Sequence, residues 1–456
     1  MPLRFGTDGI RGVANRELTP ELALALGRAA ARRLPPGSFV LGADTRRSGS
    51  MLKGALGAGI TAEGRDVLDV GVVPTPGLAW LAADRHLPAA MISASHNPFP
   101  DNGIKLLSPE GTKLSDALER AVEQELDELL ALRGATSAAT GAPVGRFVGT
   151  VKEEREAVER YAAHLLAAVA LSPRRRLRVV CDCANGAASA VAPAVLRAAG
   201  AQVRVLAAAP DGTNINEGCG STHPEALAAA VREERADLGL ALDGDADRLI
   251  AIDHTGALVD GDHLIALFAT DLAARGELEG GAVVVTVMSN LGLRRALGAR
   301  GIEVVETPVG DRHVADALEA NRLVLGGEQS GHIVFRRHAT TGDGILTGLK
   351  LLELVSRDPD GRPLAELAAM AMTRLPQELR TVAVAAPGRL GEAASIWQEV
   401  TDIERALAGS GRVVLRASGT EPAIRVMVEA ETHEDAAAAV DRLARVVSTE
   451  LGAPTP

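Results

Sequence analysis

Aromatic side chains are scarce in this chain of 456 residues: phenylalanine, tryptophan and tyrosine together make up 2% of it. Proteins that bind single-stranded nucleic acid use aromatic rings as stacking platforms, so this composition argues against that class. The formal net charge of −11 also argues against nucleic acid or an anionic membrane as the main partner. The sequence therefore predicts no nucleic acid and no membrane among its partners.

Cysteine is scarce too, and long apolar runs are absent. Three cysteines (Cys181, Cys183 and Cys219) are too few for a disulfide framework. Together with His223 they offer four possible zinc ligands, but Cys-x-Cys lacks the usual two-residue spacing of a zinc knuckle. We therefore expect buried, reduced thiols and no zinc site. No apolar run is long enough to span a membrane, and the first residues lack an apolar signal core. We expect a cytoplasmic protein that is a monomer or a homodimer.

An internal pattern repeats three times along the chain. Each copy begins with an apolar strand, continues through an Ala- and Leu-rich stretch that ends at a glycine, and then enters a second strand, a helical stretch and a third strand. The first strands lie at 39–46, 177–186 and 282–290, and the third strands at 89–98, 238–248 and 322–332. The glycines suit helix C-caps. This order is typical of a mainly parallel sheet with crossover helices.

The fold class predicted from this pattern is α/β, with three related α/β domains and a smaller α+β domain at the C-terminus. A Gly/Ala/Thr-rich stretch at 134–150 and a charged helix at 152–169 are expected to separate the first two copies. The tail offers three strands, a closing helix that starts at a capping box at 432–435, and a connection that can flex. The predicted domains are 1–150, 151–258, 259–374 and 375–456.

All three third strands end in an unusual polar loop: SASHNP at 93–98, DGDADR at 243–248 and GEQSGH at 327–332. Ligands of such sheets bind beyond the carboxyl ends of the strands. If the domains face one another, the three loops converge on one central cleft.

The aspartates of the second loop predict a metal site. In an extended chain, Asp243, Asp245 and Asp247 point to the same side. Three hard oxygen ligands with open positions suit Mg²⁺. A calcium-binding EF-hand is excluded, because Arg248 and His254 stand at the sixth and twelfth positions, where that loop needs Gly and Glu.

Ser95 in the first loop is either a hydrogen-bonding turn residue or a nucleophile. No G-x-S-x-G elbow surrounds it, which disfavours acyl transfer. A phosphoserine fits better, because its charge of about −1.5 to −2 would be balanced by the metal and by nearby cations. The sequence supplies His96, Lys105 and Arg248 as those cations.

Three further motifs offer groups that suit a phosphorylated sugar. TDGIRG at 7–12 contains Arg11 and is followed later by Lys105, and GEQSGH contains Glu328, Ser330 and His332, which suit hydroxyl recognition. RASGTEP at 416–422, with the next strand, offers a phosphate cradle made of Arg416, Ser418, Gly419, Thr420 and Arg425. No Walker A motif or dinucleotide fingerprint occurs, which disfavours a nucleotide or NAD enzyme.

These five motifs stand in the order found in the α-D-phosphohexomutases, and the chain resembles that family over nearly its whole length. VGDRHV at 309–314, GGEQSGH at 326–332 and TTGDGIL at 340–346 resemble the branch that acts on hexosamine phosphates. Two residues depart from the family pattern: Ala246 stands where glycine is common, and Ala417 where proline or lysine is common. Neither departure removes a ligand.

The resemblance implies four domains around a central cleft and one Mg²⁺ per chain, held by a phosphoserine at Ser95 and the three aspartates. It implies transfer of a phosphoryl group between the 6- and 1-positions of a hexosamine phosphate through a bisphosphorylated intermediate, in the synthesis of amino-sugar nucleotides and cell-wall precursors. It makes Ser95, Arg11, Lys105, His332 and Arg248 the catalytic or stabilising groups. The implied substrate-binding groups are His96, Glu328, Ser330, Arg416, Ser418, Gly419, Thr420 and Arg425.

Three alternatives remain open at this stage. A mutase of the same family that acts on mannose or glucose phosphate uses the same chemistry. A metal-dependent phosphatase would release free phosphate instead of an isomerised sugar phosphate. A regulator that only binds sugar phosphates would need neither the serine nor the three aspartates.

Overall fold

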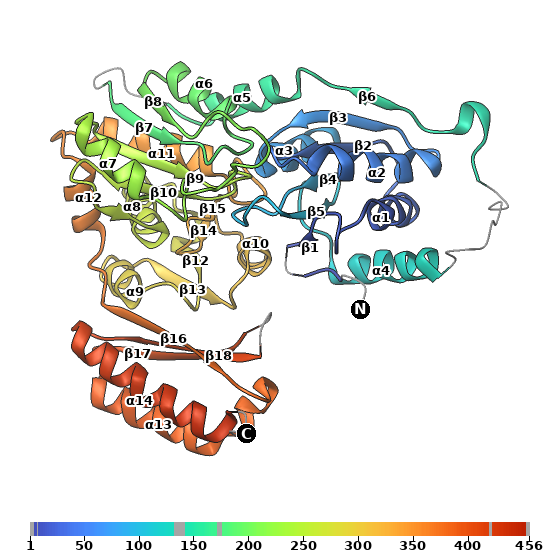
Figure 1. Ribbon diagram of the computed structural model, residues 1–456. Coiled ribbons are helices and arrows are strands. Elements are labelled where there is room, and N and C mark those ends of the chain that lie inside the picture. The colour runs from blue at the N-terminus through green and yellow to red at the C-terminus, as the bar shows by residue number, and fades with distance from the viewer. Residues whose placement is uncertain (1–3, 7, 132–141, 171–175, 419–421, 453–456) are drawn as a thin grey trace.

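The computed structural model describes residues 4–6, 8–131, 142–170, 176–418 and 422–452, which form four α/β units (Figure 1). The first unit contains a six-stranded sheet in the order β1-β5-β4-β2-β3-β6. Its strands are β1 (Ile10–Val13), β2 (Phe39–Ala43), β3 (Val67–Val72), β4 (Ala89–Ile92), β5 (Asp101–Leu107) and β6 (Val151–Glu153), and its helices are α1 (Pro20–Arg33), α2 (Gly49–Ala62), α3 (Thr75–Arg85) and α4 (Asp116–Ala131).

The second and third units repeat the centre of this sheet, with strand orders β11-β10-β9-β7-β8 and β13-β12-β14-β15. The second unit consists of α5 (Ala157–Ala167), β7 (Arg178–Asp182), α6 (Val191–Ala198), β8 (Gln202–Leu206), α7 (Glu225–Glu233), β9 (Leu238–Leu242), β10 (Leu249–Asp253) and β11 (Leu258–Val259). The third consists of α8 (Gly261–Ala274), β12 (Ala282–Thr286), α9 (Leu291–Gly298), β13 (Glu303–Thr307), α10 (Asp311–Ala320), β14 (Leu325–Gly327), β15 (Ile333–Phe335), α11 (Gly344–Arg357) and α12 (Leu364–Ala371).

The three sheets confirm the repeat and correct one feature of it. In each, the first predicted strand pairs in parallel with the second and the third, as β2 does with β3 and β4. The glycines that end the crossover helices, Gly64, Gly200 and Gly301, all have positive φ, as helix C-caps require. However, the strand after each polar loop returns antiparallel to the third strand. Each polar loop is therefore a hairpin connection, and the sheets are mixed.

The segment after the first unit differs from its prediction. A helix was expected over 152–169, but Val151–Glu153 form a strand that pairs in parallel with β3 at the edge of the first sheet. Helix α5 starts only at Ala157. Pairing with a strand more than eighty residues away overrides the local helical pattern of a charged segment.

The second and third units share one hydrophobic core, which runs from Tyr161 to Met372. The first unit has cores of its own on the two faces of its sheet. The fourth unit also has its own core, between a three-stranded sheet and the helices α13 (Ala394–Leu407) and α14 (His433–Leu451). The fourth unit is therefore packed as a separate body.

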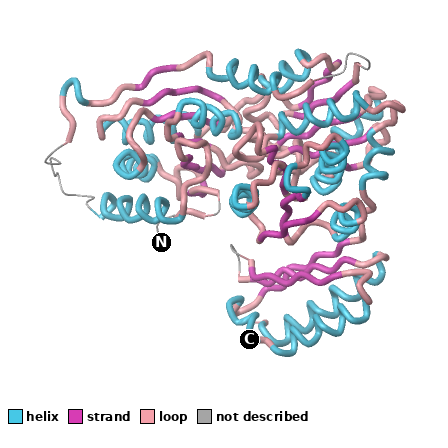
Figure 2. The backbone as a smooth tube through the Cα atoms, turned by 180° about the vertical axis from the view of Figure 1, so that it is seen from behind, coloured by secondary structure: helices cyan, strands magenta, loops and turns pink. Residues whose placement is uncertain are grey.

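The sheet of the fourth unit has the order β16-β18-β17, made of β16 (Gln377–Ala383), β17 (Arg412–Ala417) and β18 (Ala423–Glu429). All its pairings are antiparallel. Its helices cover the face turned away from the third unit, as both views show (Figures 1 and 2). No helix among the described residues is both long and apolar enough to cross a membrane.

Candidate active site

The polar loops of the first two units meet directly. Ser95 Oγ, in the loop after β4, donates a hydrogen bond of 2.5 Å to Asp243 Oδ2, in the loop after β9. Ser95 is 1% exposed and Asp243 is fully buried. Two segments 148 residues apart therefore build one site at the carboxyl ends of their strands.

The three aspartates of the second loop come together, although not as the sequence predicted. The loop is turned and not extended, and Ala246 has a left-handed φ of 57°. A left-handed conformation costs an alanine about 1 kcal/mol more than a glycine, which explains why glycine suits this position. The turn still brings one oxygen each of Asp243, Asp245 and Asp247 within 4.8 Å of one another.

The charges of this cluster leave room for a cation. Burial raises the pKa of Asp243 well above its usual value, and the neighbouring carboxylates of Asp247 and Asp245 raise it further. One oxygen each of Asp245 and Asp247 is buried and has no hydrogen-bond partner within the described part of the chain. Buried carboxylate oxygens without partners are costly, and hard oxygen donors are the ligands that Mg²⁺ prefers. The residues present therefore fit a magnesium ion.

Lys105 contacts the aspartate cluster directly, and Arg11 is linked to Lys105 through Asp8. Lys105 Nζ is 2.9 Å from Asp245 Oδ2 and 3.0 Å from Asp8 Oδ2. Arg11 also pairs with Asp8. Burial opposes the charge of Lys105, but the carboxylates of Asp245 and Asp8 raise its pKa above the usual value. Lys105 therefore keeps its proton and lies as a cation beside Asp245.

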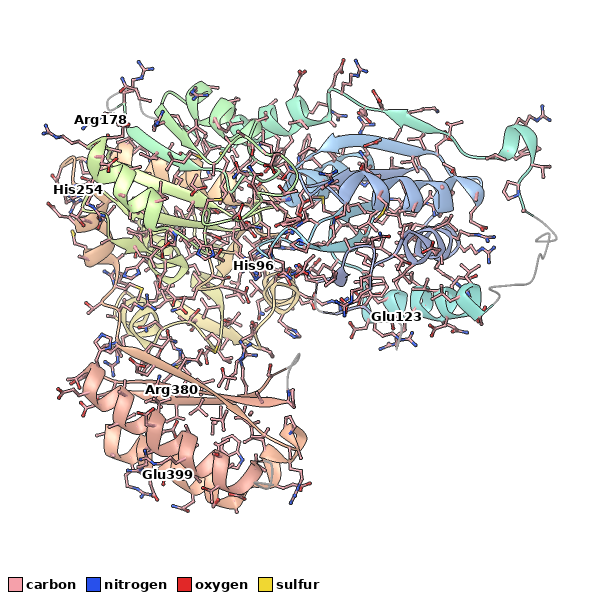
Figure 3. The ribbon with its side chains drawn as sticks, in the orientation of Figure 1. His96, Glu123, Arg178, His254, Arg380 and Glu399 are labelled. Atoms are coloured by element: carbon pink, nitrogen blue, oxygen red, sulfur yellow. The ribbon has the colours of Figure 1, made fainter. Side chains whose placement is uncertain are left out.

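His96 and Arg248 complete the surroundings of the serine. Figure 3 shows His96 in the middle of the molecule, where the first unit meets the second and third. Burial, followed by the charges of Arg248 and Arg11, lowers the pKa of His96 to about 4. Arg248 Nε is 3.7 Å from Asp247 Oδ1 and has no hydrogen-bond partner among the described residues. A guanidinium in this state is available to an anionic ligand.

The third loop reaches the same site through His332. Its Nδ1 lies 3.7 Å from Asp247 Oδ2, and its Nε2 accepts a hydrogen bond of 3.0 Å from the Gly342 amide. Burial lowers the pKa of His332, but Asp247 more than offsets this. The loop is fixed closely to the second unit, since Gly331 has a φ of 92° and a Cβ there would lie 2.1 Å from Leu249 O. Only glycine fits that position.

Glu328 and Ser330 lie on the same hairpin. Glu328 Oε1 accepts a hydrogen bond of 3.0 Å from the Gly310 amide at the start of α10, and Ser330 is exposed. A cleft of about 1180 Å³ lies between the first and third units; Asp8, Lys105 and Asp247 are among its lining residues, whereas Ser95, Glu328 and Ser330 are not. It leaves space beside the predicted catalytic groups for a phosphorylated sugar.

The predicted phosphate cradle is on the fourth unit. None of its described residues contacts the serine site directly. Arg416 and Arg425 stand opposite each other on β17 and β18. Each has a buried Nε without a hydrogen-bond partner in the described part of the chain. Burial, and then the charge of Arg425, lowers the pKa of Arg416. Gly419 and Thr420 lie outside the described residues.

Sequence reasoning missed the groups that fix the serine loop. Arg46 is buried, pairs with Asp44 at 2.9 Å, and donates to Ser95 O at 2.9 Å and to Asn97 O at 2.7 Å. Asn216 of the second unit also donates to Ser95 O, at 2.9 Å. These bonds hold Ser95 at a left-handed φ of 52°. Asp44 and Arg46 directly follow β2, so the strand-end rule applied to first strands would have found them.

Asp8, Thr75 and Lys113 were also missed. Thr75 Oγ1 donates to Asp245 Oδ2 at 2.6 Å. Lys113 Nζ lies 2.9 Å from Asp8 Oδ1 and 2.6 Å from Asp311 Oδ2, which links the first unit to the third. Cys181, Cys183 and Cys219 are buried free thiols, and within the described residues they do not gather with His223 into a group that could hold a metal.

Four domain families match the chain in sequence order. They are the α/β/α domains I, II and III of phosphoglucomutase/phosphomannomutase, over residues 2–132, 159–256 and 260–375, and its C-terminal domain, over residues 371–446. The chain belongs to the phosphoglucomutase/phosphomannomutase family.

Relatives in this family are similar over their whole length. The phosphoglucosamine mutase of Rubrobacter xylanophilus is 52% identical, with 99% of this chain and 98% of the relative covered. That of Acidothermus cellulolyticus is 51% identical, with 99% and 97% covered. A putative phosphomannomutase from Thermus thermophilus, with a solved structure, is 25% identical, has a TM-score of 0.75, and is covered over 98% of its chain and 99% of this one.

A more distant solved structure shares the fold of this phosphoglucomutase/phosphomannomutase family member. It is the N-acetylphosphoglucosamine mutase of Aspergillus fumigatus, solved in complex with GlcNAc-6P and magnesium. It is 18% identical with a TM-score of 0.65, and 99% of this chain and 96% of that chain are covered.

Proposed function

We propose that this chain interconverts glucosamine 6-phosphate and glucosamine 1-phosphate through a phosphoserine at Ser95 and a bisphosphorylated sugar. The proposal rests on the hydrogen bond of 2.5 Å between Ser95 and Asp243, which joins a serine to three clustered carboxylates. The relatives that are 51% and 52% identical carry the name of this activity.

Asp243, Asp245, Asp247 and the phosphate on Ser95 would hold one Mg²⁺. The two partnerless carboxylate oxygens and the raised pKa of Asp243 support this assignment. When bound, the ion supplies positive charge that stabilises the transferring phosphoryl group.

In the first half of the reaction, a sugar hydroxyl attacks the phosphorus on Ser95. A bond forms from phosphorus to the sugar oxygen, the bond to Ser95 Oγ breaks, and the proton of the hydroxyl passes to a neighbouring base. Lys105, Arg11 and Arg248 stabilise the charge on the phosphoryl oxygens, and His96, whose Nδ1 is 3.5 Å from Ser95 Oγ, lies beside the leaving oxygen. We assign the proton relay to His332, whose ring lies beside Asp247.

The second half returns the opposite phosphate of the bisphosphorylated sugar to Ser95. Glu328 and Ser330 bind sugar hydroxyls in either orientation. Arg416, Ser418, Gly419, Thr420 and Arg425 hold the phosphate that is not reacting. Closure of the fourth unit over the cleft would exclude water and limit hydrolysis of the phosphoserine.

We assign one loop of the site to each of four domains. The serine loop belongs to 1–150, the metal loop to 151–258, the sugar loop to 259–374 and the phosphate cradle to 375–456. The pairing of β6 with β3 favours moving the first boundary to follow Glu153.

A mutase for mannose or glucose phosphate is the second candidate. The similarity to a putative phosphomannomutase from Thermus thermophilus favours it. The choice depends on the sugar that the cleft accepts.

The test measures product and protein mass together. The purified chain with Mg²⁺ and a trace of sugar bisphosphate should convert glucosamine 6-phosphate, at a kcat/KM at least tenfold above that for mannose or glucose phosphate. Intact-protein mass should show one phosphoryl group entering and leaving. Ser95→Ala should lose both signals, and the exposed Ser448→Ala should keep both.

Chelation of Mg²⁺ should abolish turnover, and added Mg²⁺ should restore it. Release of free phosphate without an isomerised sugar would contradict the proposal and favour a phosphatase. Substantial isomerisation by Ser95→Ala would contradict the role of the serine.

A further inference from the structure

The side chain of Gln329 joins the third unit to the fourth. Gln329 lies in the sugar loop between Glu328 and Ser330. Its Nε2 donates to Asp262 Oδ2 at 3.1 Å and to Gln377 Oε1 at 3.3 Å. Gln377 is the first residue of β16, so this amide connects the sugar loop with the point where the fourth unit begins.

The backbone of the same residue fixes the loop to α8. The Gly261 amide donates to Gln329 O at 3.1 Å. Asp262, the residue that follows Gly261, is fully buried. It accepts a hydrogen bond of 2.8 Å from the Asn290 amide as well as the one from Gln329. Asp262 thereby links the sugar loop to the segment that follows β12.

That segment, residues 287–291, also holds the fourth unit. Asn290 Nδ2 donates to Leu375 O at 3.0 Å, and Asn290 Oδ1 accepts from the Leu375 amide at 3.0 Å. Arg412 donates to Val287 O at 3.1 Å, and Glu429 accepts from the Leu291 amide at 3.0 Å. The contacts concentrate on one short loop, as expected of a pivot.

The phosphate cradle stands at a distance from this pivot on the same strands. Arg412 is opposite Glu429, and Arg416 is opposite Arg425, four residues further along β17. At about 3.3 Å per residue, the two pairs are roughly 13 Å apart. Side chains alternate along a strand, and Val413 and Leu415 pack against the core of the fourth unit. Both pairs therefore lie on the opposite face of the sheet. Gln377 pairs with Glu429 beside the pivot, so a small rotation there displaces the cradle more than it displaces Gln377.

We propose that Gln329 is a positioning residue that couples the orientation of the fourth unit to the shape of the sugar-binding loop. When the cradle draws the fourth unit toward a phosphate, Gln377 moves relative to Gln329. The bond from the same Nε2 to Asp262 keeps the amide anchored to the third unit. The positions of Glu328 and Ser330 then depend on whether the distant phosphate is held. The expected effect on sugar binding rests on the proposed function. The coupling between the fourth unit and the loop rests on the contacts alone.

The test is a double-mutant cycle with Gln329→Leu, Gln377→Leu and the pair. Each single variant should raise KM for glucosamine 6-phosphate at least threefold and leave kcat within twofold. The pair should raise KM by less than the product of the two single effects, because both changes remove the Gln329–Gln377 bond. Each change also removes a second bond, from Gln329 to Asp262 or from Gln377 to Met288 O at 3.5 Å, so the single effects need not be equal. Gln398→Leu, the same change on an exposed position of α13, is the matched control.

A second readout does not need turnover. Arg374, whose side chain is 41% exposed and pairs with Asp260, precedes Leu375, the residue bonded to Asn290 of the pivot, and is a trypsin site. Without any sugar phosphate, both single variants should be cut there faster than the parent, and Gln398→Leu should be cut at the parental rate. Effects on KM that multiply in the pair, or single variants that match Gln398→Leu in both readouts, would overturn the inference. If the parent isomerises no hexose phosphate, the proposed function fails, and the cleavage rates alone still decide the coupling.

Discussion

The buried carboxylates of this protein differ in what surrounds them. Asp247 has His332, Lys105 and Arg248 as neighbours, and although burial opposes it, these groups lower its pKa. Asp343 caps α11 and accepts from the Leu346 amide at 2.9 Å and from Tyr161 Oη at 2.7 Å, without a cation. Burial raises the pKa of Asp343 to about 6 despite these two bonds. The ionised form of Asp343 is therefore unfavourable in the folded protein.

Asp343 should make stability fall as the pH rises. Between its unfolded pKa of about 4 and its folded value of about 6, the folded protein binds more protons than the unfolded chain, so the free energy of unfolding decreases through this window. Asp343→Asn should remove this part of the slope. Urea unfolding at several values between pH 4 and 7 should show the variant gaining stability relative to the parent, by up to about 2–3 kcal/mol at pH 7.

The exposed Asp316→Asn, on α10, is the control and should not change the slope. A difference between Asp343→Asn and the parent that stays constant from pH 4 to 7 would refute this account of the carboxyl group.

At the scale of elements, helix α14 is the last helix of the fourth unit and begins at a side-chain N-cap. Thr432 Oγ1 accepts from the Asp435 amide at 3.1 Å, as the capping box predicted. Glu434 and Asp435 put negative charge in the first turn, which favours the helix dipole. Val440, Leu443 and Val447 of this helix are fully buried against the sheet. The cap therefore fixes the start of an element on which the whole small core depends.

Thr432→Ala should lower the stability of the fourth unit by about 1 kcal/mol, because an N-terminal amide of α14 loses its acceptor. Thr432→Ser keeps the hydroxyl and should lose much less. The measurement is the shift of the thermal transition of this unit in both variants. Equal shifts for alanine and serine would show that the methyl group, and not the cap, carries the effect.

At the scale of the molecule, the number of cores sets how it unfolds. The second and third units share one core and should unfold together. The fourth unit meets the third through polar contacts: Arg412 donates to Val287 O at 3.1 Å, and Glu429 accepts from the Leu291 amide at 3.0 Å. A small core with a polar boundary predicts a body that melts by itself.

Calorimetry of the full chain should therefore resolve a separate transition for the fourth unit, at a lower temperature than the main one. Thr432→Ala should move this transition and leave the main one in place. A single transition, with equal calorimetric and van't Hoff enthalpies, would contradict this division.

The sequence by itself determined the strands of the three repeats, the polar loops at their ends and the motifs of the site. These features depend on local patterns: apolar runs, a glycine at the end of each crossover helix, and polar residues after each third strand. Ser95 and Asp243 could be found in this way because the rule that ligands bind beyond strand ends applies to each repeat separately. Lys105 lies within β5 and is singled out by its place a few residues after Ser95.

Only the tertiary structure decided how the repeats meet. In it, Thr75 and Lys105 contact Asp245, and Val151–Glu153 pair with the first sheet. The side chain of Gln329 bonds to the fourth unit. The physical reason is that each of these contacts joins segments far apart in the chain. Their free energy depends on the packing of whole units, and no local pattern reports it.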